Sequence, residues 1–279
     1  MVRSPQERCP PIALPASSRL PINRCNLPAV ILGSLTFQQH PTALKIDGLE
    51  QFHQDLFEQL DTMDEPGERA RHFVDYVVVH FRLEALDEAG LTPGTRRGRP
   101  KANYLLLLRG WMFDTDSREG AVLKGWVESR FGLLPRYHKV PIYSAEDDGY
   151  RRYLQDHVSG LYNTNALEAQ VDLLYAYCQY ELARRRPGQT HIVLYRGVNG
   201  LAEHDWLCRR GRSGGVVLLN SLNSFSTSAE RADEFGALVL KVRVPLSKIS
   251  YFAGLLPGLL GGEEEHMVIG GLYRVSTVE

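Results

Sequence analysis

The sequence lacks the features that mark several large classes of protein. Its 279 residues include four scattered cysteines, with no Cys-x-x-Cys pair and no histidine at metal-ligand spacing: Cys9, Cys25, Cys178 and Cys208. Neither a zinc site nor a disulfide framework is therefore expected. No apolar run reaches the roughly 18 residues of a membrane-spanning helix, and none near the N-terminus is long enough for a signal peptide. We expect a cytoplasmic protein with reduced thiols and no metal.

An excess of charge of one sign is also missing. The formal net charge is −1, which gives no reason to expect a nucleic acid or a membrane surface as partner. With 43% hydrophobic and 23% charged residues, the composition is typical of a soluble globular protein. Basic residues do cluster between Arg96 and Lys101. Such a cluster is either a solvated loop or a docking surface for an acidic partner.

Helical periodicity dominates the first two thirds of the chain. Residues 1–45 are rich in proline and are expected to be extended or irregular. Apolar residues then recur every three or four positions from Leu49 to Leu60 and from Ala70 to Phe81. Further helices are expected over 103–111, 117–131 and 165–186. The last ends in three arginines and a Pro-Gly pair, which is a strong helix stop.

After Gly188 the pattern changes to short β-like runs separated by Gly, Ser or Asn. Candidate strands cover 191–195, 216–219, 238–244, 249–252 and 266–275. Helices first and strands second predict an α+β chain, with the helices packed on one side or end of antiparallel sheets. No linker divides the sequence. We therefore expect a single domain over 1–279, with an extended segment (1–45), a mainly helical region (46–188) and a β-rich region (189–279).

Two short motifs of the β-rich region place polar groups at the ends of apolar runs. Arg196-Gly197 ends the first candidate strand. A half-buried arginine there is either a structural ion-pair partner or a ligand-binding group, and the glycine allows a ligand to approach the backbone. The second motif is Ser224-Phe225-Ser226-Thr227-Ser228, which has three hydroxyls in a row at its end. One of the three hydroxyls can cap the helix expected next, which leaves the others for a ligand.

The third motif is Glu263-Glu264-Glu265, which follows a glycine-rich loop and leads into the last candidate strand. Three adjacent carboxylates usually form a solvated acidic loop. Side chains alternate across a strand, however, so Glu263 and Glu265 are expected on one face and Glu264 on the other. Two carboxylates that point at one spot repel each other, which favours a cationic ligand or intermediate between them.

In this order, the three motifs resemble the arginine–serine–glutamate class of mono-ADP-ribosyltransferases over residues 192–275. Upstream, the segments 20–28, 102–105, 108–111 and 123–132 resemble the dinitrogenase reductase ADP-ribosyltransferase family, which extends the resemblance over nearly the whole chain. The resemblance implies a core of two packed antiparallel sheets and NAD as co-substrate. It also implies that an arginine of dinitrogenase reductase, the nitrogenase iron protein, is modified and nitrogenase thereby reversibly inactivated, under control of a PII-type signalling protein.

The resemblance also implies a role for each motif. Glu265 would stabilise the oxocarbenium-like transition state that forms as nicotinamide leaves the ribose. Arg196 would hold the NAD phosphates, because its planar donors match phosphate oxygens. Ser226 would orient Glu265 and the ribose. Glu263 would bind the acceptor guanidinium and remove its proton.

Four further residues are expected to support NAD binding. Thr227 and Ser228 would assist Ser226, and either Ser226 or Ser228 could take the leading role. Gly197 would offer backbone groups to the nicotinamide amide. Phe235 would stack on nicotinamide, or else pack in the core as an aromatic at helical spacing commonly does. Two alternative functions stay open, namely an NAD glycohydrolase and a non-catalytic NAD-binding regulatory module.

Overall fold

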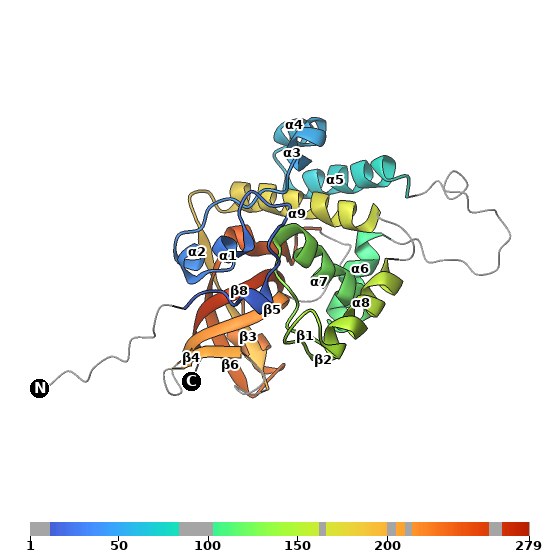
Figure 1. Ribbon diagram of the computed structural model, residues 1–279. Coiled ribbons are helices and arrows are strands. Elements are labelled where there is room, and N and C mark those ends of the chain that lie inside the picture. Colours follow the sequence, from blue (N-terminus) through green and yellow to red (C-terminus); the bar gives the residue numbers. More distant parts are fainter. Residues whose placement is uncertain are drawn as a thin grey trace, which may run out of the picture.

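Helices occupy the first two thirds of the chain and antiparallel strands the last third, which confirms the predicted α+β class (Figure 1). The computed structural model describes residues 12–83, 103–161, 166–199, 205–209, 214–256 and 264–278. Among these residues, no helix is long and apolar enough to cross a membrane. The helices cover one end of the sheet, and the strands curve away below them (Figure 1).

The segment 1–45 is not irregular throughout, contrary to expectation. Helices α1 (Ala29–Leu32) and α2 (Leu35–Gln39) interrupt it. Ser34 caps α2 by accepting a hydrogen bond from the Phe37 amide, and Phe37 is buried. A good N-cap and one buried aromatic ring thus stabilise a helix that is too short to show a periodic pattern.

The predicted helix over Leu49–Leu60 is two helices, α3 (Leu49–Phe52) and α4 (Gln54–Asp61), which meet at His53. His53 is buried and its Nδ1 lies 3.0 Å from the Tyr76 hydroxyl. Phe52, which the periodic pattern places on the buried face, is 72% exposed. The break at His53 rotates the two helices relative to each other, so a single face cannot be buried along both.

Four longer helices confirm their predictions: α5 (Pro66–His80), α6 (Tyr104–Phe113), α7 (Arg118–Phe131) and α9 (Ala166–Arg185). Asn103 and Ser117 cap α6 and α7 through their side chains, and Gly132 ends α7 with a φ of 71°. Helix α8 (Asp148–Gly160) was not expected. It buries only two glycines and Tyr153, while its aliphatic residues Leu154 and Val158 are exposed, so it adds little to the core.

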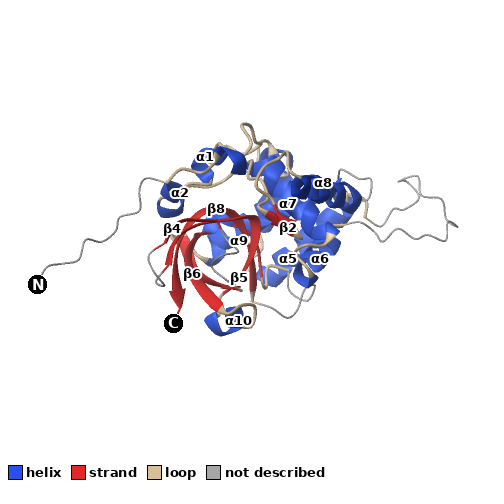
Figure 2. Ribbon diagram, turned by 60° about the horizontal axis from the view of Figure 1, so that its bottom comes forward, coloured by secondary structure: helices blue, strands red, loops and turns tan. Residues whose placement is uncertain are grey.

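Six strands form one antiparallel sheet in the order β4-β5-β3-β6-β8-β7. Their bounds are β3 His191–Val198, β4 Asp205–Arg209, β5 Gly214–Ser226, β6 Leu238–Pro245, β7 Ile249–Phe252 and β8 Glu265–Val278. Strand β5 also pairs with β8, so β5, β3, β6 and β8 close into a ring (Figure 2). A separate hairpin joins β1 (Tyr137–His138) to β2 (Val140–Pro141), and α10 (Ala229–Asp233) follows β5.

Hydrogen bonds from α9 fix the helices to the sheet. The Tyr175 hydroxyl donates to the carbonyl of Ser247 (2.8 Å), and Gln179 Nε2 donates to the carbonyl of Ile249 (2.7 Å). On the other side of α9, Asp172 accepts from Arg130 Nε (2.8 Å) and Trp126 Nε1 (2.7 Å) of α7. The chain of contacts α7–α9–β7 therefore holds α6 and α7 in a fixed position above β5 and β8.

The cysteines agree only in part with the expectation of reduced thiols. Cys25 and Cys178 are buried and free. Cys208, on the short strand β4, is disulfide-bonded, so the expectation is wrong for this residue. No group of three or more metal-binding side chains gathers anywhere in the described part of the chain.

Lys248 is buried in the turn between β6 and β7. Its Nζ donates to the carbonyl of Gly270 (2.6 Å) and lies 4.8 Å from the ring centroid of Tyr273. Burial lowers the pKa of this lysine to about 7. The folded chain therefore loses a proton that the unfolded chain keeps up to the ordinary lysine pKa of about 10.4.

We expect Lys248→Met to change how stability depends on pH. Between pH 7 and about 10 the unfolded chain binds one proton more than the folded chain, so the wild-type protein gains stability as pH rises. Lys248→Met lacks the titrating amine and therefore this pH-dependent contribution to stability. Relative to the variant, the wild type should gain up to about 4 kcal/mol of unfolding free energy over this interval. Urea unfolding of both proteins from pH 6 to 10 measures this gain. A difference in unfolding free energy that does not change with pH would contradict the lowered pKa of Lys248.

Candidate active site

The carboxylate of Glu265, at the first residue of β8, is the centre of the site. Its side chain is buried, and Oε1 accepts hydrogen bonds from Ser224 Oγ (2.5 Å) and Trp111 Nε1 (3.0 Å). The same indole nitrogen lies 3.0 Å from Ser224 Oγ. Three side chains from α6, β5 and β8 thus form a closed hydrogen-bonded group that fixes the orientation of the carboxylate.

Strand register explains why Ser224 and Glu265 meet. Ser226 lies directly opposite Glu265, and Ser224 lies opposite Met267. Because side chains alternate along a strand, Ser224, Ser226 and Glu265 lie on one face of the β5–β8 pair. Helix α6 crosses this face with Trp111, whose ring is fully buried.

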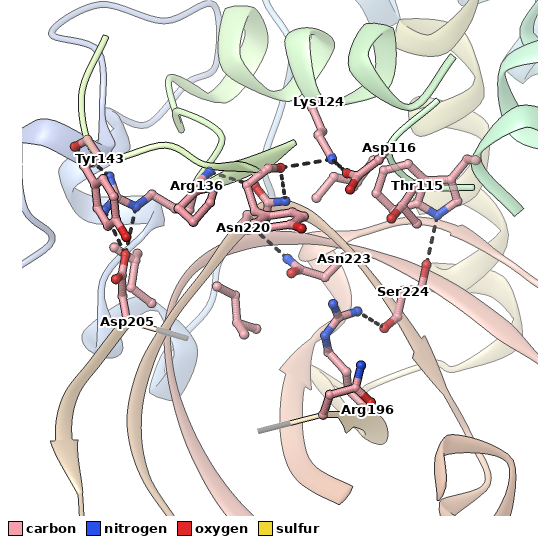
Figure 3. A pocket seen from close by; sticks show the side chains of 17 residues that line it. Thr115, Asp116, Lys124, Arg136, Tyr143, Arg196, Asp205, Asn220, Asn223 and Ser224 are labelled. Atoms are coloured by element: carbon pink, nitrogen blue, oxygen red, sulfur yellow. Dashed lines mark hydrogen bonds and ion pairs between the residues drawn. The ribbon is translucent and has the colours of Figure 1, made fainter. Parts of the chain in front are cut away.

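Arg196 of β3 lies beside this group (Figure 3). Its Nη1 donates to the carbonyl of Ser224 (2.7 Å), and its guanidinium carbon lies 6.0 Å from the ring centroid of Phe225. Its Nε is enclosed and has no hydrogen-bond partner among the described residues. Burial lowers the pKa of Arg196 to about 10, against the opposing attraction of Glu265. The side chain keeps its positive charge at neutral pH with a donor unused.

The three hydroxyls of the Ser-Thr-Ser motif each have a different partner. Ser228 Oγ accepts from the amide of Arg231 (3.1 Å), which confirms that one hydroxyl caps the following helix. Ser226 Oγ accepts from the amide of Ser228 (3.1 Å), and Thr227 donates to Glu264 Oε2 (2.7 Å). The hydroxyl that donates to Glu265 is that of Ser224, the first residue of the longer motif over 224–228, and no role was predicted for it.

Ser224 and Trp111 are the two site residues that the sequence analysis missed. Ser224 had a detectable signal, because it lies two positions before Ser226 and a strand places both on one face. Trp111 had none, since it contacts Glu265 across 154 positions of sequence. Such a contact depends on the packing of α6 against the sheet.

The remaining predicted residues divide into three cases. Gly197 lines the site, but a Cβ there would lie 2.0 Å from the carbonyl oxygen of Ala232, so the glycine allows α10 to pack against β3. Phe235 is 60% exposed with Arg231 over its ring, so its alternative assignment to the core is wrong. Glu263 and the basic cluster at 96–101 lie outside the described residues.

Two cavities meet at the hydrogen-bonded group of Trp111, Ser224 and Glu265. The Glu265 cavity has a volume of about 370 Å³ and is lined by Phe113, Asp114, Tyr195, Gly197, Ser226, Phe235, Glu264 and Glu265 among others. The Lys124 cavity has a volume of about 550 Å³ and is lined by Asp116, Lys124, Arg136, Tyr143, Asp205 and Asn220 among others (Figure 3). Trp111, Thr115, Arg196 and Ser224 line both, so the two cavities are parts of one cleft.

Comparison with known proteins identifies the relatives of the chain. Residues 22–277 match the family model for dinitrogenase reductase ADP-ribosyltransferase. The chain belongs to this family. A curated relative, the NAD(+)--dinitrogen-reductase ADP-D-ribosyltransferase of Rhodospirillum rubrum, is 39% identical over 259 residues, which cover 91% of this chain and 94% of the relative. No solved structure matches the chain.

In this member of the dinitrogenase reductase ADP-ribosyltransferase family, two ion pairs organise the Lys124 cavity. Buried Lys124 donates to Asp116 Oδ1 (2.8 Å) and to the carbonyl of Tyr137 (3.0 Å). Burial lowers the pKa of Lys124; the pKa of Asp116 is also lowered, because Lys124 outweighs the effect of burial on the carboxylate. At the far side Arg136 pairs with Asp205 (2.8 Å). With Arg196, the cavity carries three cations and two carboxylates.

We expect Trp111→Phe to destabilise the protein through Glu265. The substitution keeps a buried ring but removes the N–H that donates to a buried carboxylate, which costs about 2 kcal/mol. Trp206→Phe is the control, because Trp206 Nε1 has no hydrogen-bond partner among the described residues. Urea unfolding of Trp111→Phe, Glu265→Gln and the double variant should give a coupling free energy of about 1 kcal/mol. Additive effects would show that the indole does not support the carboxylate.

Proposed function

We propose that this chain transfers ADP-ribose from NAD to an arginine of dinitrogenase reductase, the nitrogenase iron protein, and thereby reversibly inactivates nitrogenase. One observation carries the proposal beyond family membership: a buried carboxylate, Glu265, is held by two donors where two cavities meet beside the cation Arg196. The printed name of the Rhodospirillum rubrum relative states the same reaction for that protein.

The charges along the cleft support one orientation of NAD. The Lys124 cavity, with its excess of cations, suits the diphosphate and the adenosine end. Arg196, at the junction, has an unused Nε donor for a phosphate oxygen. The Glu265 cavity carries Asp114, Glu264 and Glu265 against Arg196 and Arg231. Its negative balance suits the nicotinamide riboside end, where positive charge lies in NAD and develops on the ribose during cleavage.

The chemistry follows from that placement. The bond between C1′ of the ribose and the nicotinamide nitrogen breaks, the electron pair leaves with neutral nicotinamide, and the ribose acquires oxocarbenium character. Glu265 stabilises this charge, and its orientation is fixed in advance by Ser224 and Trp111, so no reorganisation is needed as the charge develops. A nitrogen of the acceptor arginine then bonds to C1′, and its proton passes to Glu263, the base that we assign to this step.

The other assigned residues would bind NAD and the acceptor around this centre. Ser226, directly opposite Glu265 in the sheet, would contact the ribose, with Thr227 and Ser228 holding its loop in place. Gly197 would present its backbone to the nicotinamide amide, and Phe235 would stack on the ring. Phe235, just after α10, and the 94%-exposed Phe113, at the end of α6, line the Glu265 cavity, so both are accessible to an incoming protein.

We also infer an ADP-ribosyltransferase-like core, with residues 1–279 as a single domain. In favour of such a core, the sheet bends back so that β5 pairs with both β3 and β8, which brings Arg196, Ser226 and Glu265 to one end of neighbouring strands. In favour of one domain, α9 hydrogen-bonds to the turn before β7 and α6 contributes to the site. Control by a PII-type protein belongs to the proposal through the family resemblance.

We expect the two glutamates to separate into two functions. Glu265→Gln should lower the turnover number for nicotinamide release by about 10²- to 10³-fold, since it removes charge stabilisation from the transition state, while the NAD dissociation constant changes little. Glu263→Gln should retain NAD hydrolysis and lose transfer to arginine. Labelled NAD, with and without purified dinitrogenase reductase, measures both reactions. Hydrolysis without transfer by the wild type would indicate a glycohydrolase, and NAD binding without nicotinamide release a non-catalytic module.

We expect the two serines on the face of Glu265 to differ in their kinetic effect. Ser224→Ala removes a donor to Oε1 and should lower kcat about tenfold with little change in the KM for NAD. Ser226→Ala removes the proposed ribose contact and should mainly raise that KM. Ser159→Ala, an exposed position of α8, is the matched control. Equal loss of kcat in both site variants would contradict the separate roles.

A further inference from the structure

Three cations lie together on the exposed side of the sheet, outside the cleft. Lys241 and Arg243 of β6 and Arg274 of β8, which we call the cationic patch, are exposed and line a cavity of about 390 Å³. Strand β6 lies at the end of the molecule away from α5, and β8 runs beside it from the centre of the molecule (Figure 1). The described helices leave these side chains uncovered.

Two cations of the patch lie side by side where the β6–β8 ladder ends. The last registered pair is Val242 with Val275, and Arg243 and Arg274 are the next residues of the two strands. The Gln38 side chain joins the strands at this point, because its Nε2 donates to the carbonyls of both arginines (3.1 and 3.2 Å). Neighbouring like charges repel.

No described carboxylate lies within ion-pair distance of any cation of the patch. Arg243 Nη2 contacts only a ring nitrogen, Nδ1 of His191, at 3.3 Å. The other nitrogen, Nε2, lies 2.6 Å from the carbonyl oxygen of Gln38, which can only accept. Nδ1 also lies 2.8 Å from Thr190 Oγ1, and the imidazole supplies no negative charge to Arg243. Three positive charges remain without a counter-charge from the described residues.

Strand register places the patch near the active site. Lys241 lies opposite Tyr195, Tyr195 opposite Ser226, and Ser226 opposite Glu265. Residues opposite each other point to the same face, so the four form a row across four strands. At about 4.8 Å per strand, Lys241 is about 14 Å from Glu265 along the sheet. Tyr195, between them, lines the Glu265 cavity.

We propose that the cationic patch binds acidic residues of the protein substrate that lie beside its acceptor arginine. This inference rests on the proposed function, since it requires a protein that inserts an arginine next to Glu265. A protein surface that delivers an arginine into the Glu265 cavity and extends over β3 meets Lys241, Arg243 and Arg274 next. The patch thus selects a protein that combines the arginine with negative charge that begins about 14 Å away, at Lys241, and extends further along β6 and β8.

A protein surface fits the patch better than a second nucleotide. Phosphate sites in proteins commonly use backbone N–H groups that point at the anion. Here the backbone of β6 is paired with β3 on one side and β8 on the other. The backbones of Gly214 and Gly215, which also line the cavity, are paired with β8. The long, exposed side chains of the patch attract a charged partner at a distance and fix its orientation.

The first test compares a protein acceptor with a small one. Arg243→Glu/Arg274→Glu should lower kcat/KM for transfer to dinitrogenase reductase at least about tenfold, because like charges then face each other across the interface. Transfer to agmatine, a small guanidino acceptor, should stay within about twofold of the wild type, since it does not reach the patch. Raising the salt concentration should weaken wild-type transfer to the protein and leave agmatine unaffected.

The single variant Arg243→Glu separates binding from folding. It replaces one of two neighbouring cations by an anion, so the melting temperature should stay equal or rise while transfer to dinitrogenase reductase falls. Arg71→Glu, an exposed position of α5, is the matched control and should change neither reaction.

Three outcomes are distinguishable. Loss of transfer to dinitrogenase reductase, with transfer to agmatine retained, supports the proposal for the cationic patch. Unchanged transfer to both acceptors, or equal loss with both, overturns it and leaves the proposed function intact. If the wild-type protein modifies neither acceptor, the proposed function fails and the patch proposal fails with it.

Discussion

The hydrogen bonds that join Trp111, Ser224 and Glu265 are the interaction on which the rest of the site depends. They connect a helix of the first half of the chain to two strands of the second half and end on one oxygen of a buried carboxylate. A buried carboxylate is costly unless donors satisfy it. The helical region therefore does more than cover the sheet, because it supplies one of the donors that satisfy and orient the buried Glu265 carboxylate.

The ring of strands determines which side chains can reach this point. Strand β5 pairs with β8 along most of its length and with β3 only at Ser226. This single residue pair, Tyr195 with Ser226, brings the end of β3 beside Glu265 and places Arg196 against the backbone of Ser224. Gly197 then allows α10 to approach the same strand end. Arg196, the serines of β5 and Glu265 lie close together, because β3 and β5 end where β8 begins.

Local sequence signals predicted much of the fold. The helix that ends at Arg185 was predicted from its long apolar pattern and its cation-rich end. Strand β7 was predicted at its observed bounds, because Ile249, Tyr251 and Phe252 form a short apolar and aromatic run. The break at His53 and helix α8 could not be predicted. The break at His53 depends on a tertiary contact of this residue with Tyr76. Helix α8 buries two glycines at positions where a prediction would look for large apolar residues.

For the site, order along the chain indicated Arg196 and Glu265, but it could not show which hydroxyl meets the carboxylate. That choice depends on the register of β5 against β8 and on the N-cap of α10, which uses the side chain of Ser228. Trp111 depends on packing alone. The position of Glu263 remains a prediction, since it lies outside the described residues.

The distance in sequence between Trp111 and Glu265 has a consequence for how the site forms during folding. The two residues are 154 positions apart, so their hydrogen bond closes a long loop of the chain. The carboxylate is oriented only after α6 and β8 have both packed against β5. Folding of the helical region alone, or of the strands alone, leaves Glu265 without its indole donor.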